Sequence, residues 1–382
     1  MENFKISIPT TVHFGKGVLD ELGEAAVSTG RKALLVYGKG SVKRNGVYGK
    51  IRQQLDNQGI EVTEFEGIKP NPLADDVNRA AELGKEAGVD MIIAAGGGSV
   101  IDSAKMISVC IGSDTTAWRI MIGMEKPKAA VPLLAVLTLA ATGTEMNPFA
   151  VLQNEQAGKK LGYGHPLMYP KHSFLDPAIT LTVPASYTSY GIVDLIAHAL
   201  ENYFGKGDAP LADRFVFSIL QEAMDFAKPL LNNLQDYELR ARMMYAAMMA
   251  LNGTTLYGRA SGDWGVHSVG HVISVLYDTA HGATLSIAYP AWLRLMTERT
   301  PDRIALLGRN VFGTADVNET IEKTEQFFRS IIAPVRLQEA GIEEAEAEKI
   351  SKMLTANKAG GMHHELIPED HQKLVRLMFG DF

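Results

Sequence analysis

The sequence of 382 residues contains a single cysteine, Cys110. One thiol cannot form a disulfide within the chain, so the sequence excludes a disulfide-stapled fold and is typical of a protein kept in a reducing compartment. The chain also lacks an apolar run of about eighteen residues. Residues 1–15 lack the charged and then apolar pattern of an export signal. We therefore expect a protein that is neither exported nor membrane-spanning, with a cytoplasmic location.

Positive charge is also sparse. The chain has 37 Lys and Arg residues against 44 Asp and Glu residues, which gives a net charge of −7 and a pI near 5.8. Since no basic run offers a surface for phosphates, we expect no nucleic-acid partner. The 46% of apolar and 21% of charged residues are typical of a soluble globular enzyme, and the length predicts two domains.

The first half of the chain alternates β-rich runs with amphipathic stretches. Helices are expected between four predicted strands, at residues 32–38, 60–67, 89–96 and 132–140. This alternation is typical of a parallel sheet covered by helices. Farther along the chain the strand signals give way to long apolar-periodic helices. We therefore predict a Rossmann-like α/β domain at residues 1–181 and an all-helical domain at residues 182–382.

A glycine triplet follows the third predicted strand. Gly97 and Gly98 are succeeded by Ser99, where a helix is expected to begin. Consecutive glycines let a backbone approach a pyrophosphate closely, and a helix N-terminus supplies unpaired N–H donors to the anion. The segment therefore predicts a dinucleotide-binding loop, although a tight strand-to-helix turn would have the same sequence.

The turn after the first predicted strand is expected to meet the adenosine ribose of a dinucleotide. Its space comes from three small residues, Gly38, Gly40 and Ser41. Its charge comes from three basic residues, Lys39, Lys43 and Arg44. An acidic residue at this turn typically selects NAD, whereas a 2′-phosphate needs space and positive charge. Since the segment has no acid, it favours NADP(H) over NAD(H), with a basic surface turn as the alternative interpretation.

A third loop, residues 138–147, follows an apolar strand. It carries four polar side chains, Thr138, Thr142, Thr144 and Asn147. Hydroxyl and amide groups at the carboxyl end of a strand suit phosphate, ribose or carboxamide groups. Turn and capping chemistry explains single residues of this kind equally well.

Two polar residues interrupt an otherwise apolar predicted helix. Asp194 and His198 lie four residues apart in the segment 189–204, and positions i and i+4 share one helix face. A carboxylate and an imidazole in so apolar a helix need a partner that satisfies them, and a cation does so directly. The alternative is an Asp–His hydrogen bond inside a helical core.

Three of the ten histidines, His267, His271 and His281, cluster in a second apolar segment. Together with Asp194 and His198 they supply nitrogen and oxygen donors without a thiolate. Such a set favours iron(II), zinc, cobalt or manganese. The pattern predicts one buried divalent-metal site.

These motifs occur together in one known family. The GGGSVID segment, the ATGTEMN loop, the VDLIAHALENYF helix and the histidine cluster, in this order, resemble the iron-containing (group III) alcohol dehydrogenases. The similarity is closest to their butanol-dehydrogenase and NADPH-dependent aldehyde-reductase branch, and it covers nearly the whole chain. It implies a dehydroquinate-synthase-like fold, with an active site between the two domains and iron(II) or zinc as the metal.

The resemblance also assigns roles to individual residues. It implies that Asp194, His198, His267 and His281 bind the metal. His271 would line the cleft, either as a proton relay or as a purely structural residue. The positions that match dinucleotide contacts of the family are Asn71, Gly97, Gly98, Ser99, Asp102, Thr138, Thr142, Asn147 and Lys160. The resemblance further implies a homodimer.

The donor set and the resemblance together imply aldehyde reduction and alcohol oxidation. A divalent metal polarises the substrate oxygen while hydride is exchanged with C4 of the nicotinamide. No arginine lies beside the metal motifs to bind a carboxylate. We therefore expect uncharged short- to medium-chain aldehydes and primary alcohols as substrates.

Three other functions fit parts of the pattern. An NAD-dependent glycerol or polyol dehydrogenase would share the fold, but the basic turn at residues 38–44 disfavours it. A metal-dependent lyase of the dehydroquinate-synthase type would need several basic residues around the metal, and the motifs contain almost none. A protein that keeps the metal only as a structural staple would not need the nucleotide loops.

Overall fold

The structure, a computed structural model, describes residues 1–381. It divides into two compact units. Residues 7–183 and 235–248 form one, called here the α/β unit, and residues 1–6, 184–234 and 249 onward form the other, called the helical unit. Helix α9 (Tyr237–Ala250) is thus almost entirely part of the α/β unit, although its sequence lies among helices of the helical unit.

The α/β unit is built on a six-stranded parallel sheet with the order β1-β8-β5-β4-β2-β3. The strands are β1 (Thr11–Phe14), β2 (Lys32–Gly38), β3 (Glu61–Ile68), β4 (Met91–Gly96), β5 (Leu133–Leu137) and β8 (His172–Leu175). Four of them confirm the strands predicted from the sequence. Residues 33–37 of β2 are all buried, because a parallel strand covered on both faces has no solvent side.

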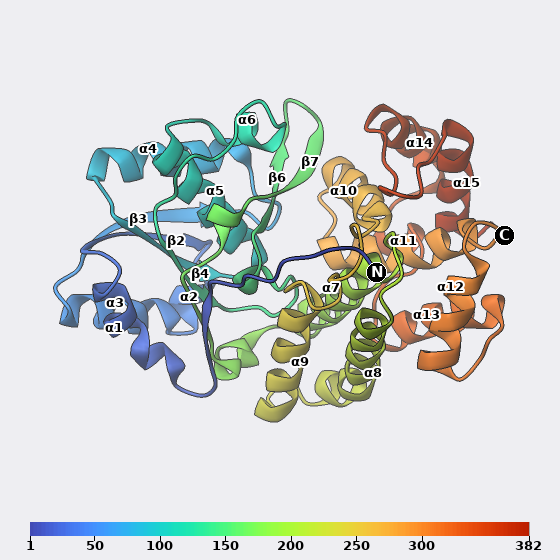
Figure 1. Cartoon of the computed structure of the whole chain (residues 1–382), viewed down its shortest axis with the longest axis horizontal. Coiled ribbons are helices and arrows are strands. Elements are labelled where there is room, and N and C mark those ends of the chain that lie inside the picture. The colour runs from blue at the N-terminus through green and yellow to red at the C-terminus, as the bar shows by residue number, and fades with distance from the viewer. Residues whose placement is uncertain (382) are drawn as a thin grey trace. The chain divides into compact units, whose positions relative to one another are not determined.

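Helices cover both faces of this sheet (Figure 1). The 3-10 turn η1 (Val18–Glu21) leads into α1 (Leu22–Val27), which packs beside α3 (Val47–Asn57) on one face. The other face carries α4 (Ala74–Ala87) and α5 (Gly98–Ser113), and the short helices α2 (Ser41–Arg44) and α6 (Ala117–Met121) lie in connections. Helix α4 ends at Gly88, whose φ of 63° provides the left-handed conformation that commonly terminates a helix.

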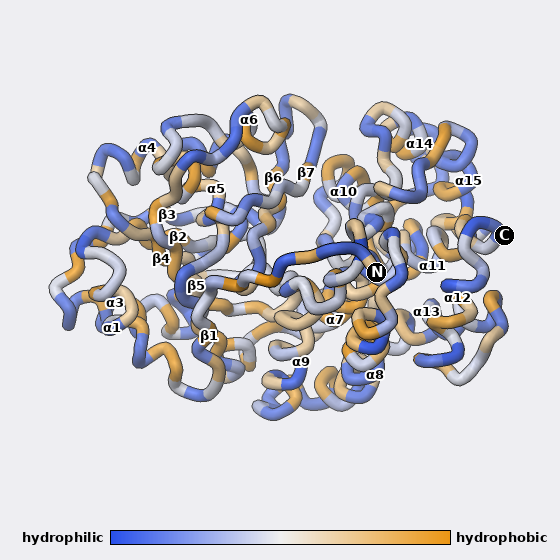
Figure 2. Tube along the Cα trace, viewed as in Figure 1, coloured by the Kyte–Doolittle hydropathy of each residue, from blue (hydrophilic) through white to orange (hydrophobic). Residues whose placement is uncertain are grey.

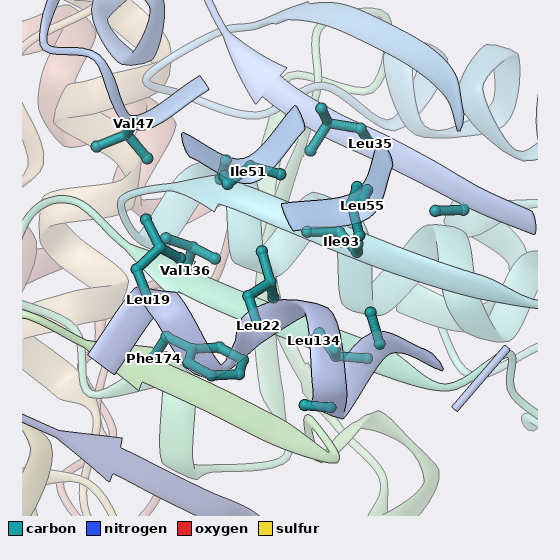
Figure 3. Close-up of a cluster of buried hydrophobic side chains, with 14 of the residues drawn as sticks. Leu19, Leu22, Leu35, Val47, Ile51, Leu55, Ile93, Leu134, Val136 and Phe174 are labelled. Carbon is teal, nitrogen blue, oxygen red and sulfur yellow. The ribbon is translucent and has the colours of Figure 1, made fainter. Parts of the chain in front are cut away.

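A cluster of buried hydrophobic side chains joins η1, α1 and α3 to the sheet (Figure 3). Alternate residues of the central strands point to this face, since successive side chains in a strand alternate sides. Each fully buried aliphatic side chain contributes roughly 1.5–3 kcal/mol relative to an exposed one. Members drawn in Figure 3 include Leu19, Leu22, Leu35, Ile51, Ile93, Val136 and Phe174.

A separate antiparallel pair interrupts the parallel pattern. Strands β6 (Phe149–Asn154) and β7 (Lys159–Gly164) form a two-stranded sheet in which Gln153 lies opposite Lys160. The alternation of strands and helices in the sequence did not predict this hairpin. Its position matters because it carries Lys160, one of the residues expected to contact a dinucleotide.

The helical unit consists of packed helices, as predicted. They are α7 (Ala185–Tyr203), α8 (Pro210–Asn232), α10 (Gly265–Tyr277), α11 (His281–Leu295), α12 (Pro301–Leu307), α13 (Val317–Ser330), α14 (Ala347–Ala356) and α15 (Pro368–Phe379). Hydrophilic and hydrophobic residues alternate along α8 in Figure 2, the pattern of a helix with one face buried. No helix within residues 1–381 is long and apolar enough to cross a lipid bilayer.

Candidate active site

Helix α7 places Asp194 and His198 on one buried face. The two residues are 3% and 5% exposed, and His198 Nε2 lies 3.6 Å from Asp194 Oδ1. A hydrogen bond between these atoms would be shorter. The simple alternative, an Asp–His hydrogen bond within a helical core, is therefore not what the geometry contains.

Close helix packing brings the other histidines to α7. His267 lies in the first turn of α10, and His281 is the first residue of α11. A Cβ on Gly282 would lie 2.3 Å from the backbone oxygen of Tyr190 on α7, and one on Gly270 would lie 2.7 Å from Thr284 Oγ1 on α11. Because glycine has no side chain at these two crossings, the three helices can approach closely enough for their polar residues to meet.

Three imidazoles converge on one carboxylate oxygen. From Asp194 Oδ1, the Nε2 atoms of His198, His281 and His267 lie 3.6, 3.7 and 3.8 Å away. One donor atom each from Asp194, His267 and His281 lie within 4.8 Å of one another. Donors about 2.1 Å from a tetrahedral ion lie about 3.4 Å apart. The spacing of the cluster is therefore close to that of ligands around one divalent ion.

Burial and nearby carboxylates set the charge of the cluster. Desolvation lowers the pKa of the His198 imidazole to about 4, which keeps this ring neutral. Desolvation acts in the same direction on the pKa of His267, but the carboxylates of Asp194 and Glu201 outweigh it and raise that pKa to about 9. A buried anionic centre surrounded by imidazoles is one that a cation stabilises.

The donor set fits a transition-metal ion. The Nε2 atom of His267 lies 3.8 Å from Asp194 Oδ1, and an imidazole nitrogen is a common metal ligand once its proton is lost. Neutral imidazoles with one carboxylate suit iron(II), zinc, cobalt or manganese. All four residues predicted as ligands lie in the helical unit; Asp194, His267 and His281 form the close group, and His198 lies 3.6 Å from Asp194 Oδ1.

Sequence reasoning missed Glu201, which contacts one of these histidines. Its Oε1 atom accepts hydrogen bonds from the backbone N–H of His267 and from the ring Nδ1, both at 2.9 Å. Glu201 lies seven residues after Asp194, so both project from similar positions on α7. That i, i+7 spacing on an apolar helix is the signal that could have revealed it.

The structure places His271 beside the cluster without putting it among the converging donors. Its ring centroid lies 5.5 Å from that of His281 and 6.4 Å from that of His267. His271 is half-buried, one turn along α10 from His267. This position agrees with the expectation that it flanks the metal ligands.

In the α/β unit, the glycine triplet joins β4 to α5. The helix begins at Gly98, one residue earlier than expected. A Cβ on Gly98 would lie 2.5 Å from Thr142 Cγ2, so two residues predicted to contact a dinucleotide are packed against each other. The Ser99 hydroxyl donates to the backbone oxygen of Pro70. The N-terminus of this 16-residue helix has no side-chain cap, which leaves it suited to an anion.

The loop that follows β5 is held by internal contacts. Asn147 is 2% exposed; its Nδ2 donates to the Gly143 oxygen at 2.9 Å, and its Oδ1 accepts from the Phe149 backbone N–H at 2.9 Å. Asp102 accepts from the Thr144 hydroxyl at 2.6 Å and from the Val151 N–H at 2.9 Å. These two side chains therefore brace the loop.

Sequence reasoning also missed Lys105, a lysine of α5 with no exposed surface. Its Nζ atom donates to Thr144 Oγ1 and to backbone oxygens of the same loop. It follows Asp102 by three residues in a helix otherwise rich in apolar side chains, and that spacing was the available signal. Thr138, by contrast, is only half-buried, and its backbone N–H donates to the Gly96 oxygen at 3.0 Å.

Two further predicted residues meet at the β6–β7 hairpin. Lys160 Nζ donates to Asn71 Oδ1 at 2.8 Å, and both side chains are buried. Gln153, opposite Lys160 in the hairpin, is also buried. A buried lysine ammonium beside polar oxygens marks a place where positive charge is concentrated.

The turn after β2 retains part of the predicted free positive charge. Gly40 has a φ of 74° and precedes the four-residue helix α2, which begins at Ser41. Gly38 ends β2, where a Cβ would lie 3.3 Å from the Ile68 oxygen. The Lys43 ammonium already donates a hydrogen bond to Glu66 Oε2 at 2.8 Å.

Two family models match successive parts of the chain. The model described as iron-containing alcohol dehydrogenase matches residues 9–177, and the C-terminal model of the Fe-containing alcohol dehydrogenase family matches residues 188–377. The probable NADH-dependent butanol dehydrogenase 1 of Bacillus subtilis (strain 168) is 39% identical, over 98% of this chain and 99% of its own. The chain belongs to the iron-containing alcohol dehydrogenase family.

Other family members support the same branch. The NADPH-dependent aldehyde reductase YqhD of Escherichia coli (strain K12) is 32% identical, over 93% of each chain. The crystal structure of NADH-dependent butanol dehydrogenase A from Thermotoga maritima matches with a TM-score of 0.95 and 36% identity, over 99% of each chain. The family and fold expected from the sequence motifs are thereby confirmed, and this iron-containing alcohol dehydrogenase is an oxidoreductase with NAD(P) chemistry on alcohols and aldehydes.

Proposed function

We propose that this family member exchanges hydride between NADP(H) and short- to medium-chain aldehydes or primary alcohols, with a divalent metal held by Asp194, His198, His267 and His281. The observation that carries the proposal is the convergence of three histidine Nε2 atoms on Asp194 Oδ1 at 3.6–3.8 Å. Iron(II) and zinc both suit this donor set.

The four ligand residues have complementary roles. Asp194 supplies the negative charge that offsets a dication, and the three imidazoles supply neutral donors from α7, α10 and α11. When bound, the metal supplies Lewis acidity that polarises a substrate carbonyl or lowers the pKa of an alcohol. Burial of Asp194, His198 and His267 keeps competing water away from these donors.

The loops of the α/β unit suit a dinucleotide. The N-terminus of α5 at Gly97, Gly98 and Ser99 would receive the pyrophosphate. Lys160, held by Asn71, would place its ammonium against phosphate charge. The remaining proposed contacts are Gly38, Gly40, Ser41, Asp102, Thr138, Thr142 and Asn147. The bound nicotinamide supplies the hydride.

The preference for NADP(H) rests on charge at the β2 turn. Lys39 and Arg44 are both exposed there, whereas Lys43 is neutralised by Glu66 at 2.8 Å. Two cations remain to attract a 2′-phosphate. Relatives carry both kinds of name, NADH-dependent in Bacillus subtilis and NADPH-dependent in Escherichia coli, so this choice needs a direct measurement.

Substrate class follows from the charge of the helices that carry the ligands. Neither α7 nor α10 contains a lysine or an arginine, and the one arginine of α11, Arg294, lies in the last turn of that helix, away from His281, and pairs with Glu325. A carboxylate-bearing substrate would therefore lack a cation beside the ligands on these helices to pair with. Uncharged aldehydes and primary alcohols are favoured for this reason.

A homodimer is the proposed assembly. Strand β1 is at the edge of the six-stranded sheet and pairs only with β8 among the described strands. An exposed strand edge offers unpaired backbone groups to a second chain. Light scattering after size-exclusion chromatography would yield twice the 41.5 kDa mass of one chain; the mass of a single chain contradicts the proposal.

The deciding experiment measures metal and turnover together. Metal-stripped protein is reconstituted separately with iron(II) and zinc, and butanal reduction is followed with NADPH and with NADH. We expect metal-dependent turnover with the higher kcat/KM for NADPH. A higher kcat/KM with NADH would contradict only the proposed preference for NADPH. The absence of metal-dependent turnover with both nucleotides would contradict the proposed reaction.

A matched pair of histidine variants tests the ligand set. His267→Ala should lose bound metal and turnover together. His371→Ala serves as the control, because His371 is a buried histidine of the same unit whose contacts are Ala359 and Thr355. It should retain metal. If His267→Ala retains wild-type metal content, His267 is not a ligand.

A second pair tests the cofactor turn. Replacing Lys39 and Arg44 together by Ala should lower the ratio of kcat/KM for NADPH to that for NADH, because the 2′-phosphate loses its attraction. Lys50→Ala is the control, since Lys50 is an exposed lysine of α3 that pairs with Asp20. An unchanged ratio of the two kcat/KM values in the double variant would mean that the adenosine ribose binds away from this turn.

A further inference from the structure

Glu201 makes two hydrogen bonds to one residue through one oxygen atom. Its Oε1 atom lies 2.9 Å from the backbone nitrogen of His267 and 2.9 Å from the ring Nδ1. Glu201 is 2% exposed and His267 is 6% exposed, so water does not compete for these contacts. The pair joins α7 to α10 across 66 residues of sequence.

The backbone contact supplies a cap that α10 cannot supply itself. The residue before the helix, Trp264, has a φ of 65° and no side chain that can accept a hydrogen bond from the first turn. His267 is the third residue of α10, and N–H groups of a first turn have no acceptor within the helix. The carboxylate of Glu201 therefore stabilises this helix end, where negative charge is favoured.

The ring contact fixes which nitrogen faces the metal ligands. A carboxylate can only accept hydrogen bonds, so Nδ1 of His267 carries the proton that it shares with Glu201. In a neutral imidazole the lone pair then lies on Nε2. That atom is the one 3.8 Å from Asp194 Oδ1. The same contact prevents rotation of the ring about its bond to the helix.

We propose that Glu201 is the positioning residue for His267. It holds the backbone and the ring of His267 in one rigid geometry, so that Nε2 is pre-aimed at the ion and its donor strength is increased by the carboxylate on the opposite nitrogen. This inference rests on the proposed function, in which His267 binds the metal. It assigns to Glu201 an orienting role and no direct contact with metal, substrate or nucleotide.

Asp263 provides a matched control for electric charge. It is a fully buried acid beside Glu201, and its backbone N–H donates to the Glu201 backbone oxygen at 2.9 Å. Its carboxylate accepts from the backbone N–H groups of His363 and His364 at 3.0 and 3.2 Å. Asp263→Asn therefore removes a nearby acid while leaving the Glu201–His267 contacts intact.

The experiment uses full-length metal-free protein and measures affinity for cobalt(II) by competition with a chromophoric chelator. The visible absorption bands of bound cobalt(II) report ligand geometry independently of turnover. The variants are Glu201→Ala, Glu201→Gln, Asp263→Asn and His267→Ala. Circular dichroism and thermal denaturation of each metal-free variant measure folding separately from metal binding.

We expect Glu201→Ala to bind cobalt(II) about 10- to 100-fold more weakly, the usual effect of losing a partner that orients a metal-binding histidine. Glu201→Gln, of the same shape but without charge, should show a smaller loss and shifted cobalt(II) bands. Asp263→Asn should bind close to the wild-type affinity. If Glu201→Ala does not fold, the affinity and bands of Glu201→Gln decide the matter.

Three outcomes overturn the inference. Wild-type affinity and bands in the Glu201 variants mean that the carboxylate does not position His267. An equal loss in Asp263→Asn means that buried negative charge, and not orientation, attracts the ion. Loss of helix content in the Glu201 variants with unchanged cobalt(II) affinity leaves only the capping role. A distinct result would contradict the proposed function itself, namely wild-type cobalt(II) affinity in His267→Ala.

Discussion

Lys105 donates two hydrogen bonds to Asn147, one to the backbone oxygen at 2.8 Å and one to Oδ1 at 3.1 Å. The Phe149 oxygen at 2.7 Å and Thr144 Oγ1 at 2.6 Å also lie within hydrogen-bonding distance, so the three N–H groups of the ammonium are shared among four oxygens. A lysine with no exposed surface is stable only when its donors are satisfied. Helix α5 thus holds the loop of residues 143–149 through one side chain.

Replacing Lys105 with Met should loosen this loop. The substitution keeps much of the side-chain volume but leaves several buried oxygens without a donor, and we expect the free energy of unfolding to fall by roughly 2–4 kcal/mol. Chemical denaturation measures the loss, and hydrogen exchange of residues 143–149 locates it. Lys85→Met, at a half-buried lysine of α4 that pairs with Asp114, is the control. Wild-type exchange rates in this loop contradict the bracing role.

Glu145 is a buried acid of the same loop, and its protonation should make stability depend on pH. Burial raises the pKa of its carboxyl from 4.5 to about 7. Between these values the folded protein holds a proton that the unfolded chain releases. The resulting contribution to the free energy of unfolding is complete below pH 4.5 and is lost as the pH rises through about 7.

Glu145→Gln removes this titration, so its stability relative to wild type should rise as the pH increases. Between about pH 5 and 7.5 the gain should be about 2 kcal/mol. Melting temperatures of the two proteins across that range measure it. Glu155→Gln, at an exposed turn residue, should show a constant difference from wild type. A constant difference for Glu145→Gln would mean that Glu145 is ionised in the folded protein throughout.

Lys160 and Lys159 are neighbouring lysines that differ in burial, so comparing their variants distinguishes a specific phosphate contact from general surface charge. Lys160 is 8% exposed and donates to Asn71, whereas Lys159 is exposed. Lys160→Met should raise the KM for the dinucleotide by about tenfold with little change in kcat, because a charge-assisted contact to phosphate is lost. Lys159→Met should leave both constants near wild type. Equal effects from the two variants would mean that Lys160 acts only through general positive charge and makes no specific contact with phosphate.

His271 flanks the proposed metal ligands and is the proposed proton relay. His271→Ala should keep its metal and lose about 100-fold in kcat, the lower range for a missing general acid or base. Metal analysis and the pH dependence of kcat measure the two effects. Retained metal with an unchanged pH profile would assign His271 a structural role.

The sequence predicted the features that depend on the local pattern of apolar and polar residues. Continuous apolar runs predicted β2, β4 and β5 because strands buried on both faces have no polar side. The i, i+4 pair Asp194 and His198 was readable because helix geometry places such residues on one face. The β6–β7 hairpin was missed because the alternating α/β pattern suggested parallel strands alone, and strand pairing depends on partners distant in the sequence.

The sequence by itself indicated the family, and it predicted the order of the nucleotide loops and the donors of one metal site, since these depend on residue type and spacing. Only the tertiary structure decided that three imidazoles meet one carboxylate oxygen, that Glu201 orients His267 across 66 residues, and that Lys105 braces the loop carrying Asn147. Such contacts arise where glycines let helices cross closely and where buried donors must find acceptors. Helix spacing makes Glu201 and Lys105 recognisable in the sequence, but the partners that they contact lie 66 and 42 residues away.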